Sequence, residues 1–377
     1  MEIRRSESYG MKKYIRYVRL MQCAFVALAV GTGGCNAREA PADWKAECVG
    51  RMQVSLPGDV DVAGVSKQSW LKSRSVPGSV AVYAFADEQK AEWSDLGFLG
   101  EVLITHPLSQ SDLKTFTQEI ERGRLTVKKF NDKLSKETNK RAFSDLPVAS
   151  QNGYAWGVEN GTVAQLFVAT HYFSWDSYSD LAEVEQRQHF QTIIDGLSYR
   201  GPHSLTSTPG VCIPYAFIRD DGKSPRHISM TYRLREHPDV TIMLKDASAV
   251  EVDTKANPKV YDPESVSDSF WSRYDNAYRK SLRGAWSTPY KRIKMAGAKG
   301  VVSFVKIVRE DDAVDYGYLV VARGDPKAKE DTPDLMLYVI QDSKNAKAKG
   351  IKPIGKDEFL EMAQTIAASV KRRPVSR

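Results

Sequence analysis

The chain has 377 residues, of which 42% are hydrophobic and 10% aromatic, and its formal net charge is +7. This composition excludes a globally disordered protein, and the length favours two domains over a single core. Six basic and two acidic residues fall within residues 1–34, which leaves only about +3 on the rest of the chain. Such a small and scattered excess argues against a phosphate-binding surface, so no nucleic-acid partner is expected.

The N-terminal segment predicts export. Counted from Met11, a basic stretch precedes an apolar run from Leu20 to Val30. This run is about half of the ~20 residues that a membrane-spanning helix needs, which favours a signal peptide over a membrane anchor. We therefore expect residues 1–35 to be a signal peptide of the lipoprotein type.

Cys35 is the predicted lipidation site, because the small residues Gly33 and Gly34 precede it as in a bacterial lipobox. Thr32 stands where a lipobox usually carries leucine. Acyl chains on Cys35 would hold the protein to a membrane leaflet without a spanning helix. Ordinary cleavage at the small residues that follow Cys35 is the alternative. In both cases the mature protein is expected in the periplasm.

Residues 44–200 are predicted to form an N-terminal α+β domain. Met52–Leu56 alternates apolar and polar residues, as a half-buried strand does. Asn160–Gly161 between two alternating segments predicts a β-hairpin. Phe190, Ile193 and Leu197 recur at the spacing of one helix face. Further strands are expected over 80–85 and 98–104, a helix from residue 111, and a charged loop or frayed element over 128–141.

Residues 201–210 are rich in Gly, Pro, Ser and Thr and lack periodicity, so they predict a linker. Residues 211–373 then form the predicted C-terminal α+β domain, in which Asp262–Pro263 starts a helix. Strands are expected over 212–217, 227–233, 240–245, 300–305, 316–322 and 335–340, and a last helix over 359–370.

The order of elements recurs after roughly 150 to 170 residues, which suggests a duplicated unit. The predicted fold class is therefore α+β, with two similar α+β domains, each an antiparallel sheet with packed helices. Two unrelated α+β domains are the alternative.

Cys48 and Cys212 are the cysteines that remain beyond Cys35, and each stands at the start of one predicted domain. Exported bacterial proteins meet an oxidising compartment, which favours a disulfide between them. Two buried free thiols are the alternative. Neither cysteine has a Cys or His neighbour at ligand spacing, so a metal site is not expected.

The search for catalytic motifs yields no convincing candidate. Gly196–Arg200 resembles a nucleophile elbow around Ser198, but it lacks the final glycine and follows a helix. The six histidines are dispersed without metal-ligand spacing. No catalytic, cofactor-binding or metal-binding residue is therefore predicted, and the protein is not expected to be an enzyme. A site assembled from distant residues would leave no such motif.

Two aromatic clusters are the best candidates for partner-binding loops. They contain Trp175 and Tyr178 in the first predicted domain, and Trp286 and Tyr290 in the second. Tryptophan and tyrosine on loops are typical anchors of protein interfaces. Packing of these side chains in the core is the alternative.

Glu47–Gly58, with Glu-Cys-Val-Gly-Arg-Met at its start, and Gly210–Ile213 followed by Phe217–Ile218 resemble immunity proteins of type VI secretion phospholipase effectors. The resemblance extends over both predicted domains. It implies a two-domain α+β protein of the periplasm that grasps a lipase-type toxin and prevents its active site from opening to lipid. It implies no particular interface residue.

Three functions are thus open at this point. The first is an immunity protein that occludes a cognate phospholipase effector toxin. The second is an exported lipoprotein that acts as an envelope scaffold or binding module. The third is a periplasmic hydrolase that uses Ser198 or a histidine.

Overall fold

The computed structural model describes residues 40–76, 79–138, 143–148, 153–158, 161–177, 181–251, 262–274, 290–309 and 311–375. The predicted signal peptide with Cys35 lies outside these residues, as do Tyr178 and Trp286. Within the described part of the chain, none of the helices is both long enough and apolar enough to cross a membrane.

The structure confirms the α+β class. Its described helices are α1 (Lys67–Ser75), α2 (Gln110–Thr138), α3 (Glu183–Gly196), α4 (Pro263–Arg273), α6 (Ser343–Ala348) and α7 (Lys356–Ser369). Strands of the first half are β1 (Lys45–Val49), β2 (Met52–Leu56), β3 (Val60–Val62), β4 (Gly64–Val65), β5 (Tyr83–Ala84), β6 (Asp95–Phe98), β7 (Glu101–Ile104), β8 (Phe143–Leu146), β9 (Tyr154–Val158), β10 (Gly161–Val168), β11 (His171–Asp176) and β12 (Leu197–Tyr199). Strands of the second half are β13 (Gly210–Ile213), β14 (Ala216–Arg219), β15 (Arg226–Leu234), β16 (Val240–Ala247), β17 (Lys291–Met295), β18 (Ala298–Val308), β19 (Val314–Arg323), β20 (Asp334–Gln341) and β21 (Lys371–Arg372).

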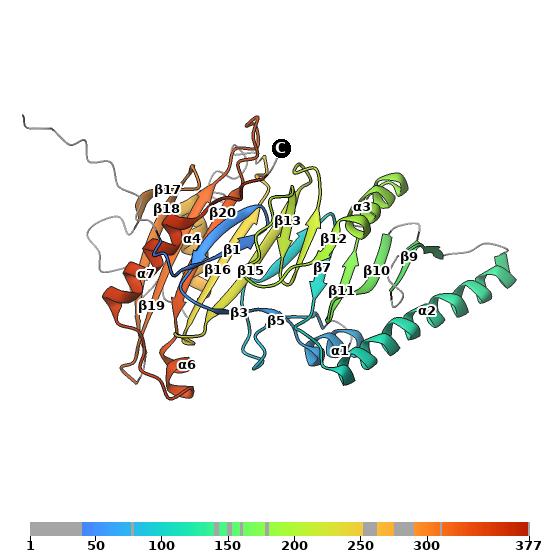
Figure 1. Ribbon diagram of the computed structural model, residues 1–377, viewed down its shortest axis with the longest axis horizontal. Coiled ribbons are helices and arrows are strands. Elements are labelled where there is room, and N and C mark those ends of the chain that lie inside the picture. Colours follow the sequence, from blue (N-terminus) through green and yellow to red (C-terminus); the bar gives the residue numbers. More distant parts are fainter. Residues whose placement is uncertain are drawn as a thin grey trace, which may run out of the picture. The chain divides into compact units, whose positions relative to one another are not determined.

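One large antiparallel sheet contains strands from both halves of the chain (Figure 1). Its order is β17-β18-β19-β20-β16-β15-β6-β7-β11-β10-β9-β8, and β3 also pairs with β15. The two halves meet where β6 pairs with β15, with Phe98 opposite Arg226 and Asp95 opposite Ser229. The two expected sheets are therefore joined edge to edge, which leaves neither half with an unpaired strand at this junction.

The two half-sheets have the same topology when they are followed outward from the junction. The first half gives β6, β7, β11, β10, β9 and β8, and the second half gives β15, β16, β20, β19, β18 and β17. In both halves a two-strand hairpin is followed along the chain by a helix and then by a four-strand meander, whose last strand pairs with the second strand of the hairpin. This repeated order supports the predicted duplication more directly than sequence similarity does.

The halves also exchange elements. A short hairpin precedes each half-sheet (β1–β2 and β13–β14), and a helix with a short strand follows it (α3–β12 and α7–β21). Strand β21, at the end of the second half, pairs with β2 of the first hairpin. Strand β12, at the end of the first half, pairs with β14 of the second hairpin. Each hairpin is thus extended by the last strand of the other half, which we call its closing strand. Residues from 38 onward form one compact unit. The division into residues 44–200 and 211–373 stays a prediction.

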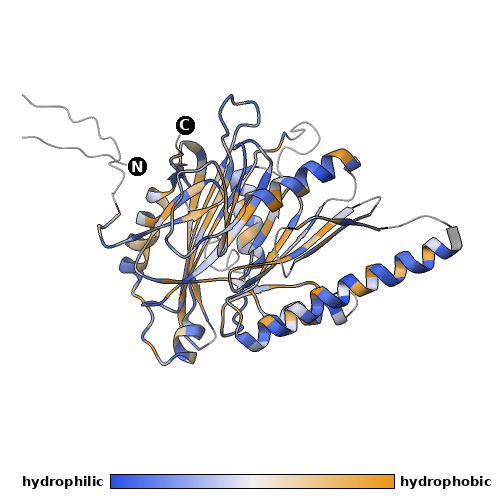
Figure 2. Cartoon of the chain, turned by 45° about the vertical axis from the view of Figure 1, so that its right-hand side comes forward, coloured by the Kyte–Doolittle hydropathy of each residue, from blue (hydrophilic) through white to orange (hydrophobic). Residues whose placement is uncertain are grey.

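Apolar side chains cover both faces of the second half-sheet. On one face, β1, β2 and α7 pack over β15, β16 and β19, with Tyr232, Leu244 and Phe359 among the fully buried residues. On the other face, Trp271 of α4 packs on Val305 and Leu319. Figure 2 shows that hydrophobic residues, in orange, predominate in the strands, whereas hydrophilic residues, in blue, recur along the helices.

Four segments differ from the prediction. The expected strand over 212–217 is the hairpin of β13 and β14, and the expected strand over 98–104 contains the turn between β6 and β7. Residues 128–138 continue α2 and are not a loop, since their lysines, glutamate and leucine are good helix formers. His171–Asp176 forms strand β11 and is not part of a loop, because it pairs with both β10 and β7. The charge of residues 128–138 and the aromatic content of His171–Asp176 favoured loops in the sequence analysis, although both segments have regular structure.

Gly317 of β19 tests the packing beneath α4. A Cβ atom at this position would lie 2.4 Å from Trp271 Cη2 and 2.9 Å from Val305 Cγ2. We expect Gly317→Ala to lower the free energy of unfolding by about 1–3 kcal/mol through overpacking, as measured by chemical denaturation. Gly123→Ala in α2 is the matched control, since its Cβ would meet only Gln165 at 3.7 Å. It should stabilise by about 0.5–1 kcal/mol, and equal effects of the two substitutions would contradict this packing.

Candidate functional site

The junction between the two halves is built around the hairpin turn at Gly50–Arg51. Gly50 has φ of +55°, a conformation that favours glycine. A Cβ atom on Gly50 would lie 2.3 Å from Asp246 Oδ2. The same oxygen accepts a hydrogen bond of 2.7 Å from the backbone N–H of Arg51. Glycine at position 50 therefore lets the first hairpin approach a buried carboxylate of β16.

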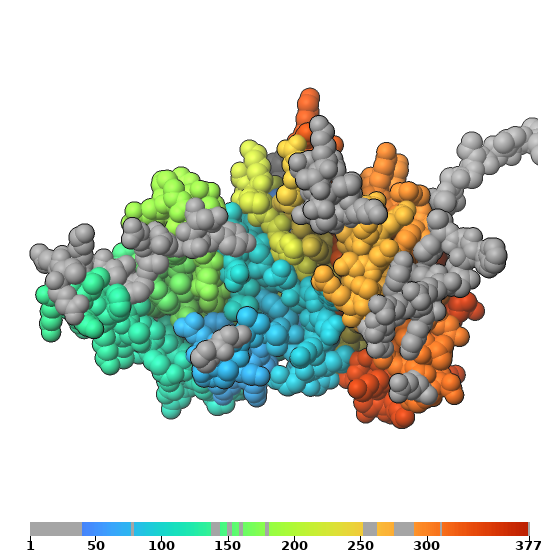
Figure 3. Space-filling model, turned by 180° about the vertical axis from the view of Figure 1, so that it is seen from behind, coloured from blue at the N-terminus to red at the C-terminus, as the bar shows by residue number. Residues whose placement is uncertain are grey.

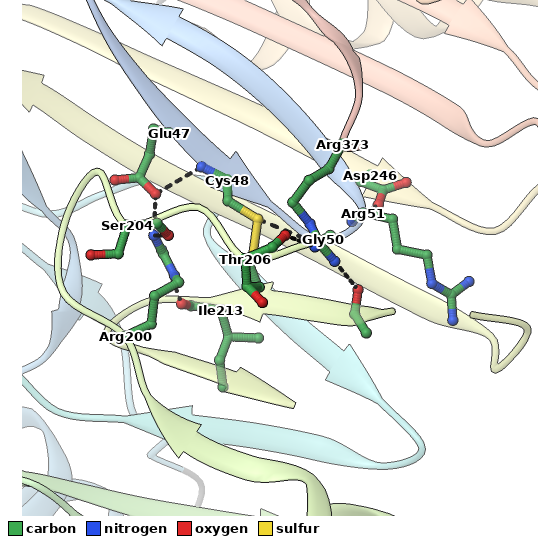
Figure 4. Close-up of a disulfide and its surroundings, with 12 residues drawn as sticks. Glu47, Cys48, Gly50, Arg51, Arg200, Ser204, Thr206, Ile213, Asp246 and Arg373 are labelled. Atoms are coloured by element: carbon green, nitrogen blue, oxygen red, sulfur yellow. Dashed lines mark hydrogen bonds and ion pairs between the residues drawn. A yellow bond between two sulfur atoms is a disulfide. The ribbon is translucent and has the colours of Figure 1, made fainter. Parts of the chain in front are cut away.

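A disulfide joins Cys48 of β1 to Cys212 of β13, with a Cα–Cα distance of 5.8 Å (Figure 4). Both cysteines are fully buried, and each is the penultimate residue of the first strand of its hairpin. Beside the disulfide, Gly50 and Cys212 exchange two backbone hydrogen bonds of 2.8 Å. The two hairpins are thus tied together at equivalent positions by covalent and hydrogen bonds.

Glu47 holds the linker segment against the first hairpin. Its fully buried carboxylate forms an ion pair with Arg200 and accepts hydrogen bonds from the backbone N–H groups of Cys48 and His203, at 2.7 and 2.8 Å. Figure 4 shows Arg200 directed toward Glu47. A buried carboxylate with these partners is satisfied, so it has a structural role at this place.

A second group of buried charges lies on the opposite side of the disulfide. The Arg226 guanidinium binds Asp246 through two hydrogen bonds of 2.6 and 2.7 Å, and both side chains are fully buried. Arg226 forms a second ion pair with Asp331, with 2.8 Å between Arg226 Nη2 and Asp331 Oδ2. Burial alone would lower the pKa of Arg226, but the two carboxylates outweigh it and raise that pKa. Arg51 extends the network to Asp220 at 2.6 Å.

Arg373, directly after β21, binds the backbone of the predicted linker. Its guanidinium donates to the carbonyl oxygens of Thr206, Thr208 and Gly210, the last two at 2.9 and 2.8 Å, and lies over the ring of Phe217. Burial, with the nearby arginines, lowers the pKa of Arg373 to about 10. Residues 201–209 lack helix and strand, whereas Gly210, the last residue of the predicted linker, begins β13. The backbone of this segment is held by Arg373.

The residues considered for hydrolytic chemistry do not converge. Ser198 lies exposed in β12 and donates to the carbonyl oxygen of Phe217 at 3.3 Å. His106 contacts the Ala84 carbonyl oxygen at 2.8 Å, and His171 the Thr105 carbonyl oxygen at 2.8 Å. Within the described residues, His, Cys, Asp and Glu form no group that could hold a metal ion.

The predicted partner-binding aromatics have different outcomes. The loop assignment of Trp175 is wrong, because this residue lies fully buried in β11 and its Nε1 donates to the Phe98 carbonyl oxygen at 3.2 Å. Tyr290 is half-buried immediately before β17, and its role in binding stays a prediction. Tyr178 and Trp286 lie outside the described residues.

A groove opens on the back of the large sheet, between residues 93–99 and helix α4. One part measures about 690 Å³ and the adjoining part about 630 Å³, and both are lined by His227, Lys245, Val266 and Met336. In Figure 3, which shows the molecule from behind, yellow residues of β15 and β16 lie between the cyan first half and the orange second half. Sequence reasoning missed this groove, because its walls come from both halves.

The buried charges of the junction give a stability prediction. Asp246→Asn removes the negative charge that compensates Arg226, and the loss of one partner of a buried ion pair costs about 3–5 kcal/mol. We expect a decrease of that size in the free energy of unfolding, measured by urea denaturation. Glu183→Gln, in an exposed pair with Arg187 on α3, should change it little. A near-neutral Asp246→Asn would mean that Arg226 does not depend on this carboxylate.

The disulfide gives a second prediction. The bond closes a loop across a sequence separation of 164 residues, for which the chain-entropy relation gives about 4–5 kcal/mol. Replacement of both cysteines, Cys48→Ala with Cys212→Ala, should therefore lower the free energy of unfolding by up to this amount. A reducing agent should reproduce the loss in the native protein and leave the double variant unchanged. A thermal unfolding midpoint that does not respond to the reductant would refute this contribution.

His106 and His171 predict how stability depends on pH. Burial lowers the pKa of both imidazoles below the ordinary value of 6.5, so the unfolded chain takes up protons first as the pH falls. The contribution of these histidines to the free energy of unfolding should therefore decrease between about pH 7 and pH 5, while Asp176, whose pKa burial raises to about 6, acts in the opposite direction. His171→Gln should reduce this slope, whereas His237→Gln, in the turn after β15, serves as the control. A slope that His171→Gln leaves unchanged would exclude this histidine as a source.

Comparison with known proteins finds sequence similarity for the second half of the chain and fold similarity for most of its length. Residues 204–375 match the family "Tle cognate immunity protein 4 C-terminal domain". No curated protein matches the chain. The immunity protein TplEi of the type VI secretion system of Pseudomonas aeruginosa, in complex with "L" peptide, has 13% identity and a TM-score of 0.53, and covers 89% of this chain and 100% of its own.

Two other solved structures have the same fold. The apo form of TplEi from Pseudomonas aeruginosa has 14% identity and a TM-score of 0.53, with coverage of 88% of this chain and 98% of its own. The structure of the Tle4–Tli4 complex gives 15% identity and a TM-score of 0.53, with coverage of 89% and 99%. The fold similarity thus extends over both halves, while the sequence match begins within the segment whose backbone Arg373 binds. The second half of the chain is thus similar in sequence to the C-terminal domain of Tle cognate immunity protein 4.

Proposed function

We propose that this protein is an immunity protein that binds a type VI secreted phospholipase toxin in the periplasm and neutralises it by occlusion, which protects the producing cell. The match of residues 204–375 to the Tle cognate immunity protein 4 family carries this proposal. The fold over 89% of the chain resembles that of a protein solved as the Tle4–Tli4 complex, which supports it for the first half too.

We infer that the protein acts by stoichiometric binding and has no turnover of its own. Ser198 donates a hydrogen bond to a backbone carbonyl oxygen. His106 and His171 contact backbone oxygens and the aromatic side chains of Tyr215 and Tyr199. Polar side chains engaged in this way stabilise the fold. An inhibitor needs a shaped surface and no nucleophile.

The junction supplies the rigidity that tight binding requires. The disulfide, the exchanged closing strands and the Arg226–Asp246 pair hold the two halves in one arrangement before any partner arrives. A preordered surface loses less conformational entropy on association, which increases the affinity. Neutralising a toxin that damages membranes demands such tight binding through a sizeable interface.

We propose that the mature protein is periplasmic, because a leader of the signal-peptide type precedes a fold that contains a disulfide. Lipidation at Cys35 would add an anchor to a membrane leaflet. Among the predicted interface aromatics, Tyr178, Trp286 and Tyr290 remain proposed contacts with the toxin.

Purified components test this function directly. The mature chain with Cys35→Ser should form an equimolar complex with the lipase-type toxin of its own bacterium, observed by size-exclusion chromatography with light scattering. Phospholipase activity of the toxin should fall linearly to zero at one equivalent of the protein. The double cysteine variant, used at a temperature where it is folded, should bind more weakly by about tenfold because its halves must be ordered on binding. Absence of complex formation with each lipase-type toxin of that bacterium would refute the immunity function.

A further inference from the structure

Lys245 has an unusual position in the groove on the back of the large sheet. It lies on β16, in the middle of the sheet, and its side chain is half-buried. Among the described residues, it makes neither a hydrogen bond nor an ion pair. Burial lowers the pKa of its ammonium group despite the carboxylates of Asp334 and Asp95 in its surroundings. A partly desolvated cation of this kind stabilises the binding of an anion.

The other cations along the groove already have partners. Arg226 is bound by Asp246 and Asp331, Arg323 by Asp334 at 2.9 Å, and His227 lies 3.3 Å from Asp95. The Arg273 guanidinium lies 5.9 Å from the ring centroid of Trp93. Lys245 therefore stands apart as the cation to which a single negative charge could bind.

The walls next to Lys245 are mainly apolar. They include Leu99 after β6, Leu181 before α3, Val266 and Phe270 on α4, and Leu335 and Met336 on β20. With about 690 Å³, the larger part has the size of a site for an ordinary small ligand. An apolar wall around one free cation is complementary to a long apolar chain with one anionic end.

The backbone of the groove floor favours such a chain over a peptide. Strand β15 pairs with β16 on one side and with β6 and β3 on the other, and β16 pairs with β15 and β20. The floor strands therefore have their N–H and C=O groups engaged within the sheet. A peptide buried against them would leave its own backbone groups without partners, which is costly, whereas an acyl chain has no such groups.

We propose that this groove is a binding site for a single-chain anionic amphiphile, such as a long-chain carboxylate, with its head group at Lys245 and its chain along Val266, Leu335 and Met336. This class includes the fatty acids that phospholipases release. The site does not depend on the toxin-binding function proposed above, and it can be tested with the mature protein alone.

Isothermal titration calorimetry of the mature chain with dodecanoate, below its critical micelle concentration, tests the proposal. We expect saturable binding at one site per chain. Lys245→Met should weaken dodecanoate binding at least tenfold, because the partly buried ion pair between the Lys245 ammonium and the dodecanoate carboxylate is lost. Lys294→Met on the edge strand β17, where the lysine is exposed, is the matched control and should bind as the native protein does.

Further probes separate the contributions of head and chain. Acetate, which has the head group alone, and dodecyltrimethylammonium, which has the chain with a positive head, should both bind at least tenfold more weakly than dodecanoate. Dodecyl phosphate, which carries another anionic head group on the same chain, should also bind at one site per chain. Asp95→Asn should strengthen dodecanoate binding about twofold, because a competing carboxylate near Lys245 is removed.

The stability of Lys245→Met shows whether a loss of binding reflects the site or the fold. Removing a half-buried charge that has no partner should leave the thermal midpoint unchanged or raise it. Equal binding of dodecanoate by the native protein and Lys245→Met, or equal binding of dodecanoate and dodecyltrimethylammonium, would overturn the proposal. Absence of dodecanoate binding to the native protein would overturn it as well. If Lys245→Met then also bound the toxin more weakly, the groove would belong to the protein interface.

Discussion

The approach of the Gly50–Arg51 turn to the Asp246 carboxylate is the contact on which the arrangement of the two halves depends. Asp246 Oδ2 accepts from the Arg51 backbone, while the same side chain neutralises Arg226. A residue larger than glycine at position 50 would displace this carboxylate. The β1–β2 hairpin can therefore pack in this position only if the Asp246 carboxylate is present and residue 50 is glycine. This packing places Cys48 beside Cys212.

The topology explains why so many different interactions meet at this junction. Each short hairpin pairs with the closing strand of the other half, so that the beginning of one half and the end of the other must lie side by side. The disulfide, the buried ion pairs and the Arg373 contacts all act where these exchanged elements meet. Motion of one half against the other would break several of them at once, which suits a protein that must present a rigid surface.

The back face of the sheet has a different physical character. The front face of the central strands is sealed by β1, β2 and α7, whereas α4 covers the back face only in part and leaves the groove around Lys245. Among the described residues, Lys245 makes neither a hydrogen bond nor an ion pair, and the carboxylates of Asp334 and Asp95 offset only part of the cost of its desolvation. A ligand that supplies the missing negative charge would recover part of it, and for this reason the groove is distinct from the satisfied charges of the junction.

The sequence alone predicted the α+β class, the order of most elements, the duplication and the pairing of Cys48 with Cys212. These features depend on local periodicity, on turn residues such as Asn160–Gly161 and on the chemistry of exported proteins. Only the tertiary structure decided that β6 pairs with β15 in one sheet, that Trp175 is buried and that Lys245 lines a groove. Each of these features depends on which distant strand lies next to a residue. An alternating pattern predicts that one face of a strand is buried, but it does not specify which strands pair with it.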